Sequence, residues 1–278
     1  MRSPVFIGSE SGLTPYELAR RHQRLLPDVY APASWTPTLR DRTVAAWLWS
    51  KRRAVVAGLA AAALHGADWV DATEPIELIW TCGRPPAGVI VRNETIADDE
   101  VTLVAGLPVT TRTRTAFDLG RHLGRGDAVA RLDALKRATA FHEADVMALI
   151  ERYRGARGVR SLRSVLPLVD VGAASPRETW LRLLLVDAGL PQPSSQYRIF
   201  DGQSLVKVLD LGWEDYLVGA EYDGDQHRTD RRQYAKDVRV KRQLARLRWN
   251  VTYVIKEDRP DEIIRSVRGA LLARGWRP

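Results

Sequence analysis

Four carboxylates in the C-terminal third of the chain have the types and spacing of ligands for a divalent cation. Asp210 lies in the apolar segment LVKVLDLGW, and Glu221 and Asp223 lie in the next one, YLVGAEYDG. Glu178 belongs to the preceding segment, PRETWLRLLLVDAGL. Carboxylates that converge in a partly buried site repel one another unless a cation offsets their charge. Oxygen ligands without cysteine favour Mg²⁺ or Mn²⁺ over zinc.

Two strands and the turn between them must position these acids. Side chains alternate along a strand, so Asp210 is expected on one face of the first strand. The opposite face is expected to carry Lys207, Leu209 and Leu211. With Glu214 and Asp215 as a two-residue turn, Asp210 falls opposite Gly219. Glu221 then becomes its diagonal neighbour on the same face, within reach of a shared ion.

A helix must bring the fourth acid to the strands. Ser175 is expected to cap this helix, Pro176 to open it and Glu178 to complete a capping box. Glu178 shares a helix face with Leu181 and Leu185, so it is expected to point inward toward the sheet. From residue 175 onward, the segments predict the order α-β-β-β-α-β-α.

These residues and this order of elements resemble the PD-(D/E)XK restriction-endonuclease-like superfamily, and within it the branch related to the very-short-patch-repair (Vsr) endonuclease. The resemblance covers roughly residues 175–260, including the strand end EYDGDQH and the segment DVRVKRQLARLRWNVTYVIKED. It implies a fold of αβββαβ type and a DNA endonuclease, a hydrolase of phosphodiester bonds in repair, restriction or defence.

The resemblance also implies a role for each acid. By it the divalent ion would be held by Glu178, Asp210 and Glu221. The catalytic site would further include Asp223, Gln226 and His227. The superfamily motif ends in a lysine, and Asp223 stands at that position. His227 is the natural substitute, because an imidazole can orient or deprotonate water near neutral pH.

The segment DRRQYAKDVRVKRQLARLRW predicts an amphipathic helix after the acids. Asp237 lies on its apolar stripe with Val240 and Leu244, so it is expected to face inward, where it pairs with a buried arginine or braces the site. The other faces carry Arg232, Lys236, Arg239, Arg242 and Arg246. These cations are candidate contacts to the DNA backbone, with an ordinary solvated basic face as the alternative.

The N-terminal region begins with a helix signal of its own. In GLTPYELARRHQRLLPDVYAP, Thr14 can cap a helix that begins at Pro15, and an extended segment follows. A basic helix before a strand is typical of a small winged helix-turn-helix, with a solvated amphipathic helix as the alternative. The candidate DNA contacts are Arg20, Arg21 and Arg24. Further on, PIELIW and GVIVR are expected to form a hairpin.

The segments VFIGSESGLTPYELARRHQRLLPDVYAP, GLAAAALHGADWV and GLPVTTRTRTAFDL are similar to AbiEi-type antitoxin and regulator proteins, over much of residues 4–140. That similarity implies a winged helix-turn-helix reader of duplex DNA. It also supports the alternative to an endonuclease, a non-catalytic regulator or antitoxin that retains a degenerate nuclease fold. The segment DVGAASPRETW predicts a linker. The expected domains are an α+β, mostly helical one over 1–172 and an α/β one over 173–278.

Composition sets the class of partner. The 278 residues include 42 basic and 34 acidic side chains, a formal net charge of +8, which favours polyanions such as DNA. The single cysteine, Cys82, excludes a cysteine-built metal centre and an intramolecular disulfide. No apolar run reaches the roughly 18 residues of a membrane span. We therefore expect a cytoplasmic, nucleoid-associated protein with DNA as partner and a second copy or a toxin protein as a further one.

Overall fold

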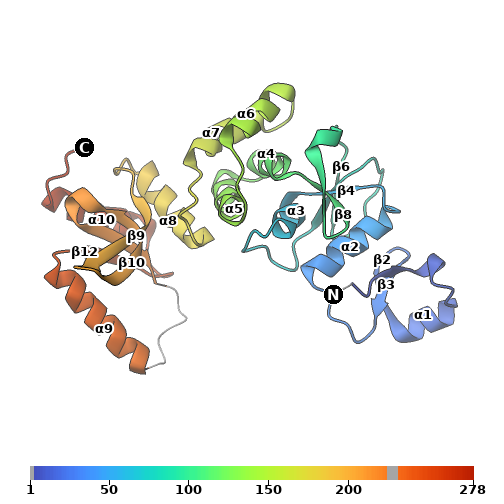
Figure 1. Ribbon diagram of the computed structural model, residues 1–278, viewed down its shortest axis with the longest axis horizontal. Coiled ribbons are helices and arrows are strands. Elements are labelled where there is room, and N and C mark those ends of the chain that lie inside the picture. Colours follow the sequence, from blue (N-terminus) through green and yellow to red (C-terminus); the bar gives the residue numbers. More distant parts are fainter. Residues whose placement is uncertain (1–2, 224–230) are drawn as a thin grey trace. The chain divides into compact units, whose positions relative to one another are not determined.

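The computed structural model describes residues 3–223 and 231–278, and it describes side chains for 3–223 and 237–278. The chain divides into two compact units, Met1–Leu168 and Val169–Pro278 (Figure 1). This division lies close to the boundary expected near residue 172. Among the helices of the described part, none has both the length and the apolar character of a membrane span.

The first unit begins with a three-stranded sheet in the order β1-β3-β2. Its elements are β1 (Phe6–Ile7), α1 (Pro15–Arg21), β2 (His22–Leu26) and β3 (Val29–Pro32). Thr14 caps α1, with Glu17 N donating to Thr14 Oγ1 at 3.3 Å and Thr14 N donating to Glu17 Oε2 at 2.8 Å. In residues 3–14, α1 follows a 3₁₀ turn rather than another α-helix. Residues 15–32 therefore form one helix and a hairpin, and the winged helix-turn-helix stays a prediction.

A five-stranded sheet in the order β6-β5-β4-β8-β7 forms the centre of the first unit. Its strands are β4 (Val55–Ala57), β5 (Ile76–Ile79), β6 (Val89–Arg92), β7 (Val101–Val104) and β8 (Leu107–Thr110). Helices α2 (Leu39–Trp49) and α3 (Gly58–Leu64) contribute buried side chains to the same core. The hairpin expected of β5 and β6 is wrong, because these strands are parallel, with Ile76 opposite Val89. The segment between two such short strands is long enough to return the chain to the same end of the sheet.

Helices then follow to the end of the first unit (Figure 1). They are α4 (Arg112–His122), α5 (Arg125–Ala138), α6 (Glu143–Arg152) and α7 (Val159–Val165). The turn before α7 requires glycine at Gly158, where φ is 83° and a Cβ would lie 2.1 Å from the carbonyl oxygen of Arg121. A left-handed φ favours glycine because it has no Cβ.

The second unit is a four-stranded sheet in the order β12-β11-β10-β9 between helices. Its elements are α8 (Pro176–Asp187), β9 (Ser194–Asp201), β10 (Ser204–Trp213), β11 (Val218–Tyr222), α9 (Arg231–Arg246), β12 (Asn250–Val254) and α10 (Pro260–Ala273). The order of helices and strands is the one that the sequence predicts. Leucines of α8 pack with α10 against Leu211 and Ala220. Leu244 of α9 packs with Ile199 and Leu209 in a second cluster, and Figure 1 shows α9 and α10 on opposite sides of the sheet.

The turn between β10 and β11 differs from the expected one. A 3₁₀ turn, Glu214–Tyr216, is followed by Leu217 in the left-handed region with φ of 50°. Trp213 therefore pairs with Val218, and Leu211 pairs with Ala220. The next position of this ladder brings Asp210 level with Glu221, so the expected pairing of Asp210 with Gly219 is wrong.

Candidate functional site

Asp210 lies half-buried near two other acids of the second unit. The backbone N–H of Tyr222 donates to Asp210 Oδ2 at 2.8 Å and fixes the carboxylate beside β11. Burial and, to a smaller extent, the negative charges of Glu178 and Glu221 together raise the pKa of Asp210 to about 7. Like charges shift a pKa in this direction only at short range. Three of the acids that the sequence singles out thus influence one another.

Glu178 reaches this region from the first turn of α8. Its backbone N–H donates to Ser175 Oγ at 3.2 Å, as expected of a cap. Its carboxylate does not return to Ser175, however, because Oε2 accepts from Ala174 N at 2.8 Å and from Gln196 Nε2 at 2.9 Å. The expected capping box is therefore incomplete. Gln196 has a left-handed φ of 50° within β9, and its amide holds the Glu178 carboxylate.

The two carboxylate oxygens of Glu221 have different surroundings. Lys207 Nζ donates to Glu221 Oε1. Glu221 Oε2 is buried and has no hydrogen-bond partner among the described residues. Burial raises the pKa of Glu221, and the hydrogen bond from Lys207 opposes that rise. A buried acceptor without a donor is destabilising, and a cation is one ligand that would satisfy it.

Lys207 is a residue that the sequence reasoning missed. Strict alternation placed it on the face away from the acids, yet its Nζ donates to Glu221 Oε1. The pairing of β9 with β10 shifts between Leu205 and Lys207, and Val206 and Leu209 pack in one cluster although alternation separates them. The strand therefore departs from strict alternation around Lys207. The only signal in the sequence was a lysine in an otherwise apolar strand, three positions before Asp210.

The remaining residues of the expected catalytic site lie farther out or are not described. Asp223 is exposed, its N–H donates to Val254 O at 2.7 Å, and its charge contributes to the raised pKa of Glu221. Gln226 and His227 lie outside the described residues. Asp237 is half-buried. Burial and the negative charges of Glu221, Asp223 and Asp237 together raise the pKa of Tyr253 to about 12, so Asp237 lies near the sheet.

A second acidic group lies in the first unit, where Glu94, Asp118 and His122 offer ligand atoms within 4.8 Å of one another. Arginines already neutralise its acids. Arg121 Nη2 donates to Asp118 at 2.9 Å and also to Glu94, and Arg114 Nε donates to Asp118 at 3.1 Å. Burial alone would raise the pKa of Glu94, but hydrogen bonds from His122 and Arg121 outweigh it and lower the pKa to about 2. This group is an ion-pair network that braces α4, and two guanidinium groups repel a metal ion there.

Exposed arginines lie on α1 and on β2, the first strand of the hairpin after it. Arg20, Arg21 and Arg24 are exposed and form no ion pair with a described residue, and Arg20 Nη1 donates to Tyr16 Oη at 3.1 Å. On α9, Arg239 and Arg242 are exposed, whereas Arg246 is paired with Asp201. The side chains of Arg232 and Lys236 lie outside the described residues.

The turn between α6 and α7 and the first turn of α7 carry cations that the sequence reasoning did not select. Arg157 and Arg160 are exposed and have no acidic partner in the described part of the chain. Buried Arg121 holds this turn, because its Nη1 donates to Arg157 O at 3.3 Å. The segment RYRGARGVRSLR, with five arginines, was the available signal.

Comparisons with known proteins match the first unit to a family and most of the chain to two relatives. Residues 54–168 match the family model of the AbiEi antitoxin C-terminal domain. Two uncharacterized proteins, from two strains of Mycobacterium tuberculosis, are each 29% identical over 244 residues, which cover 87% of this chain and 87% of each relative. No solved structure matches the chain. The AbiEi-type similarity predicted for the first half is thereby supported, and the nuclease resemblance of residues 175–260 receives no support from these matches.

Proposed function

We propose that the chain is a DNA-binding regulator of the AbiEi antitoxin type. The observation that carries this proposal is the match of residues 54–168 to an antitoxin domain. Arg20, Arg21 and Arg24 support it, because they are exposed and form no ion pair with a described residue, and such guanidinium groups suit contacts to phosphate. The proposal includes a toxin protein as second partner, and a homodimer stays a prediction.

The test is binding of the full chain to duplex DNA from upstream of its own coding sequence, followed by fluorescence anisotropy and footprinting. A regulator is expected to prefer its operator over a scrambled duplex by about a thousandfold or more. A protected footprint would locate that operator. Equal affinity for operator and scrambled DNA, at every salt concentration, would contradict the proposal.

A second candidate function is Mg²⁺- or Mn²⁺-dependent cleavage of DNA by the second unit. It is favoured by the acids around Asp210 and by Glu221 Oε2, which has no hydrogen-bond partner among the described side chains. The residues that would hold the cation are Glu178, Asp210 and Glu221, and this all-oxygen set suits a hard divalent ion. A bound ion would lower the pKa of water and stabilise charge on the phosphoryl oxygens.

The chain's own residues would orient the acids in that reaction. Tyr222 N–H holds Asp210, the Gln196 amide holds Glu178, and the Lys207 ammonium holds one oxygen of Glu221. Such fixed hydrogen bonds limit the rotation of each carboxylate before substrate arrives. Asp223 and His227 remain proposed participants on the strength of the sequence.

The second candidate is tested by nicking and cleavage assays on varied DNA structures with Mn²⁺, beside Mn²⁺ binding measured by calorimetry. The variants Asp210→Asn and Glu221→Gln are expected to lose both DNA cleavage and Mn²⁺ binding. Asp258→Asn, an acid of the same unit whose carboxylate accepts from Ile255 N at 2.9 Å, is the control and is expected to keep both. Cleavage that persists in the two site variants would refute the assigned site.

A further inference from the structure

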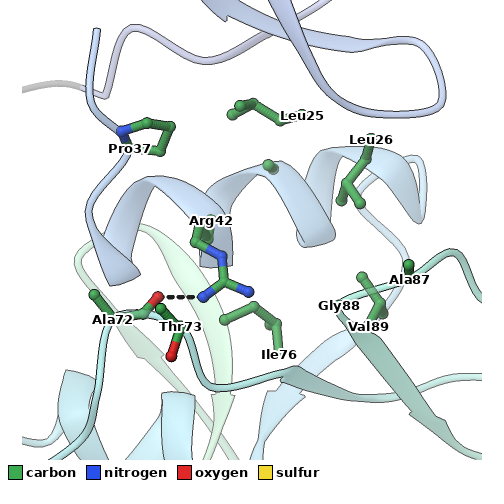
Figure 2. A pocket seen from close by; sticks show the side chains of 11 residues that line it. Leu25, Leu26, Pro37, Arg42, Ala72, Thr73, Ile76, Ala87, Gly88 and Val89 are labelled. Atoms are coloured by element: carbon green, nitrogen blue, oxygen red, sulfur yellow. Dashed lines mark hydrogen bonds between the residues drawn. The ribbon is translucent and has the colours of Figure 1, made fainter.

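A cavity of about 440 Å³ opens in the first unit beside the α1 hairpin. Its walls are largely apolar and include Leu25, Leu26, Ala45, Ile76 and Val89. They come from β2, α2, β5 and β6, so the cavity lies between the small sheet and the edge of the larger one. Figure 2 shows Arg42 extending from α2 toward Ala72 and Ile76, as the charged side chain of this lining.

The guanidinium of Arg42 is only partly satisfied by the protein. Its Nη1 donates to Ala72 O, and no carboxylate of the described residues forms an ion pair with it. The charge of Arg42 contributes to a lowered pKa of Asp71, but the Asp71 carboxylate is engaged by Thr73 N at 2.7 Å and Thr73 Oγ1 at 2.6 Å. Because a guanidinium carries five N–H donors, Arg42 retains donors for a further acceptor.

A glycine of the lining, Gly88, lies beside the guanidinium. A Cβ at Gly88 would lie 3.6 Å from Arg42 Nη2, and the φ of 80° at Gly88 also disfavours any other residue. Apolar walls with one free charged group are typical of a small-molecule site in which the polar group fixes orientation. The charge of that group selects an anion, and its planar fork of donors matches a carboxylate.

We propose that this cavity binds a small apolar carboxylate, with the carboxylate on Arg42 and the hydrocarbon part against Leu25, Leu26 and Val89. At about 30 Å³ for a water-sized atom, 440 Å³ holds about 15 such atoms. A monocarboxylic acid of about ten carbons has this size. Amphipathic cations are repelled by Arg42, and polyphosphates lose too much hydration against the apolar walls.

A ligand in the cavity would contact the hairpin directly. Leu25 and Leu26 belong to β2, which pairs with β3, and Leu26 packs against the cores of both sheets of the first unit. Arg24 on the same strand is a proposed DNA contact. A carboxylate in the cavity is therefore placed to alter DNA affinity; this consequence, unlike the binding itself, rests on the proposed function.

The test is calorimetric titration of the full chain with decanoate, decan-1-ol and decyltrimethylammonium as probes. Decanoate is expected to bind saturably at one site, at least tenfold more tightly than the alcohol, and the cation not at all. Arg42→Gln should lower decanoate affinity at least tenfold, whereas Arg40→Gln, an exposed arginine of the same helix outside the lining, should leave it unchanged.

Ala87→Phe places a ring at the exposed rim of the cavity and should abolish decanoate binding with Arg42 intact. Circular dichroism checks that each variant is folded. The proposal would be overturned by any one of three results: decanoate binds no more tightly than decanol, its binding survives both substitutions, or its binding does not saturate. No DNA is present in this titration, so a negative result would not count against the proposed regulator function. Conversely, a failure of the chain to bind DNA would not affect the result for the cavity.

Discussion

Replacing Glu94 with glutamine tests the ion-pair network that braces α4 in the antitoxin-like unit. Glu94 accepts from Arg121 Nη2, from Arg114 Nη2 at 3.4 Å and from His122 Nε2 at 3.2 Å, and its side chain is 28% exposed. Its pKa falls from 4.5 to about 2 in the folded chain. At about 1.36 kcal/mol per pKa unit, the carboxylate stabilises the fold by roughly 3 kcal/mol at pH 7.

The pH dependence has a defined sign. Because the folded pKa lies below the unfolded value, the contribution of Glu94 is fully present above pH 4.5 and is lost as the pH falls toward 2. The difference in free energy of unfolding between the wild-type chain and Glu94→Gln should therefore shrink to about 2 kcal/mol at pH 3.5 and nearly vanish near pH 2.

Urea unfolding of the full chain at several pH values measures this difference, and hydrogen exchange in α4 assigns the transition to the first unit. Glu151→Gln is the matched control. Glu151 also has two arginine partners, Arg154 and Arg163, each at 2.7 Å, but it is 47% exposed, so its loss should cost less than about 1 kcal/mol. If Glu94→Gln and Glu151→Gln were equally stable at pH 7, the reasoning would be refuted.

Three further outcomes are expected of substitutions elsewhere in the chain. Asp210→Asn should stabilise the chain against urea at pH 8 in chelator, because it removes a charge repelled by two neighbouring acids; a lower unfolding midpoint would contradict this. Gly158→Ala should destabilise the fold by about 2 kcal/mol or more. Gly155→Ala, the control, should cost much less, because a Cβ there meets nothing within 4 Å. Coincident unfolding curves of the two variants would exclude the expected backbone strain at position 158. Arg157→Ala with Arg160→Ala should reduce the slope of log affinity for DNA against log salt by about 2, and an unchanged slope would remove both from the interface.

The order of elements in the second unit followed from local signals in the sequence. The cap at Ser175, the proline after it and the apolar periodicities each act within a few residues, and these interactions persist in the folded chain. The carboxylates near Asp210 were also foreseeable as a group, because acids are rare on strands so apolar.

The register and the partners of these acids were not foreseeable in the same way. A leucine at position 217 gives no sign of the left-handed conformation that lengthens the turn. The departure from strict alternation around Lys207 depends on how β9 pairs with β10, not on β10 alone. Likewise, Arg114 and Asp118 read as an ordinary helical pair, and only tertiary packing buries them. Non-local contacts decided each of these features.

The most direct test of the regulator account is the salt dependence of DNA binding by the full chain, with and without the three arginines of α1 and β2. The wild-type chain is expected to lose affinity steeply between 50 and 200 mM salt, with a slope near −0.9 for each phosphate contacted. The variant with alanine at Arg20, Arg21 and Arg24 should show a slope smaller by about 2.7. Salt-independent binding, or a slope that the triple substitution leaves unchanged, would contradict the account.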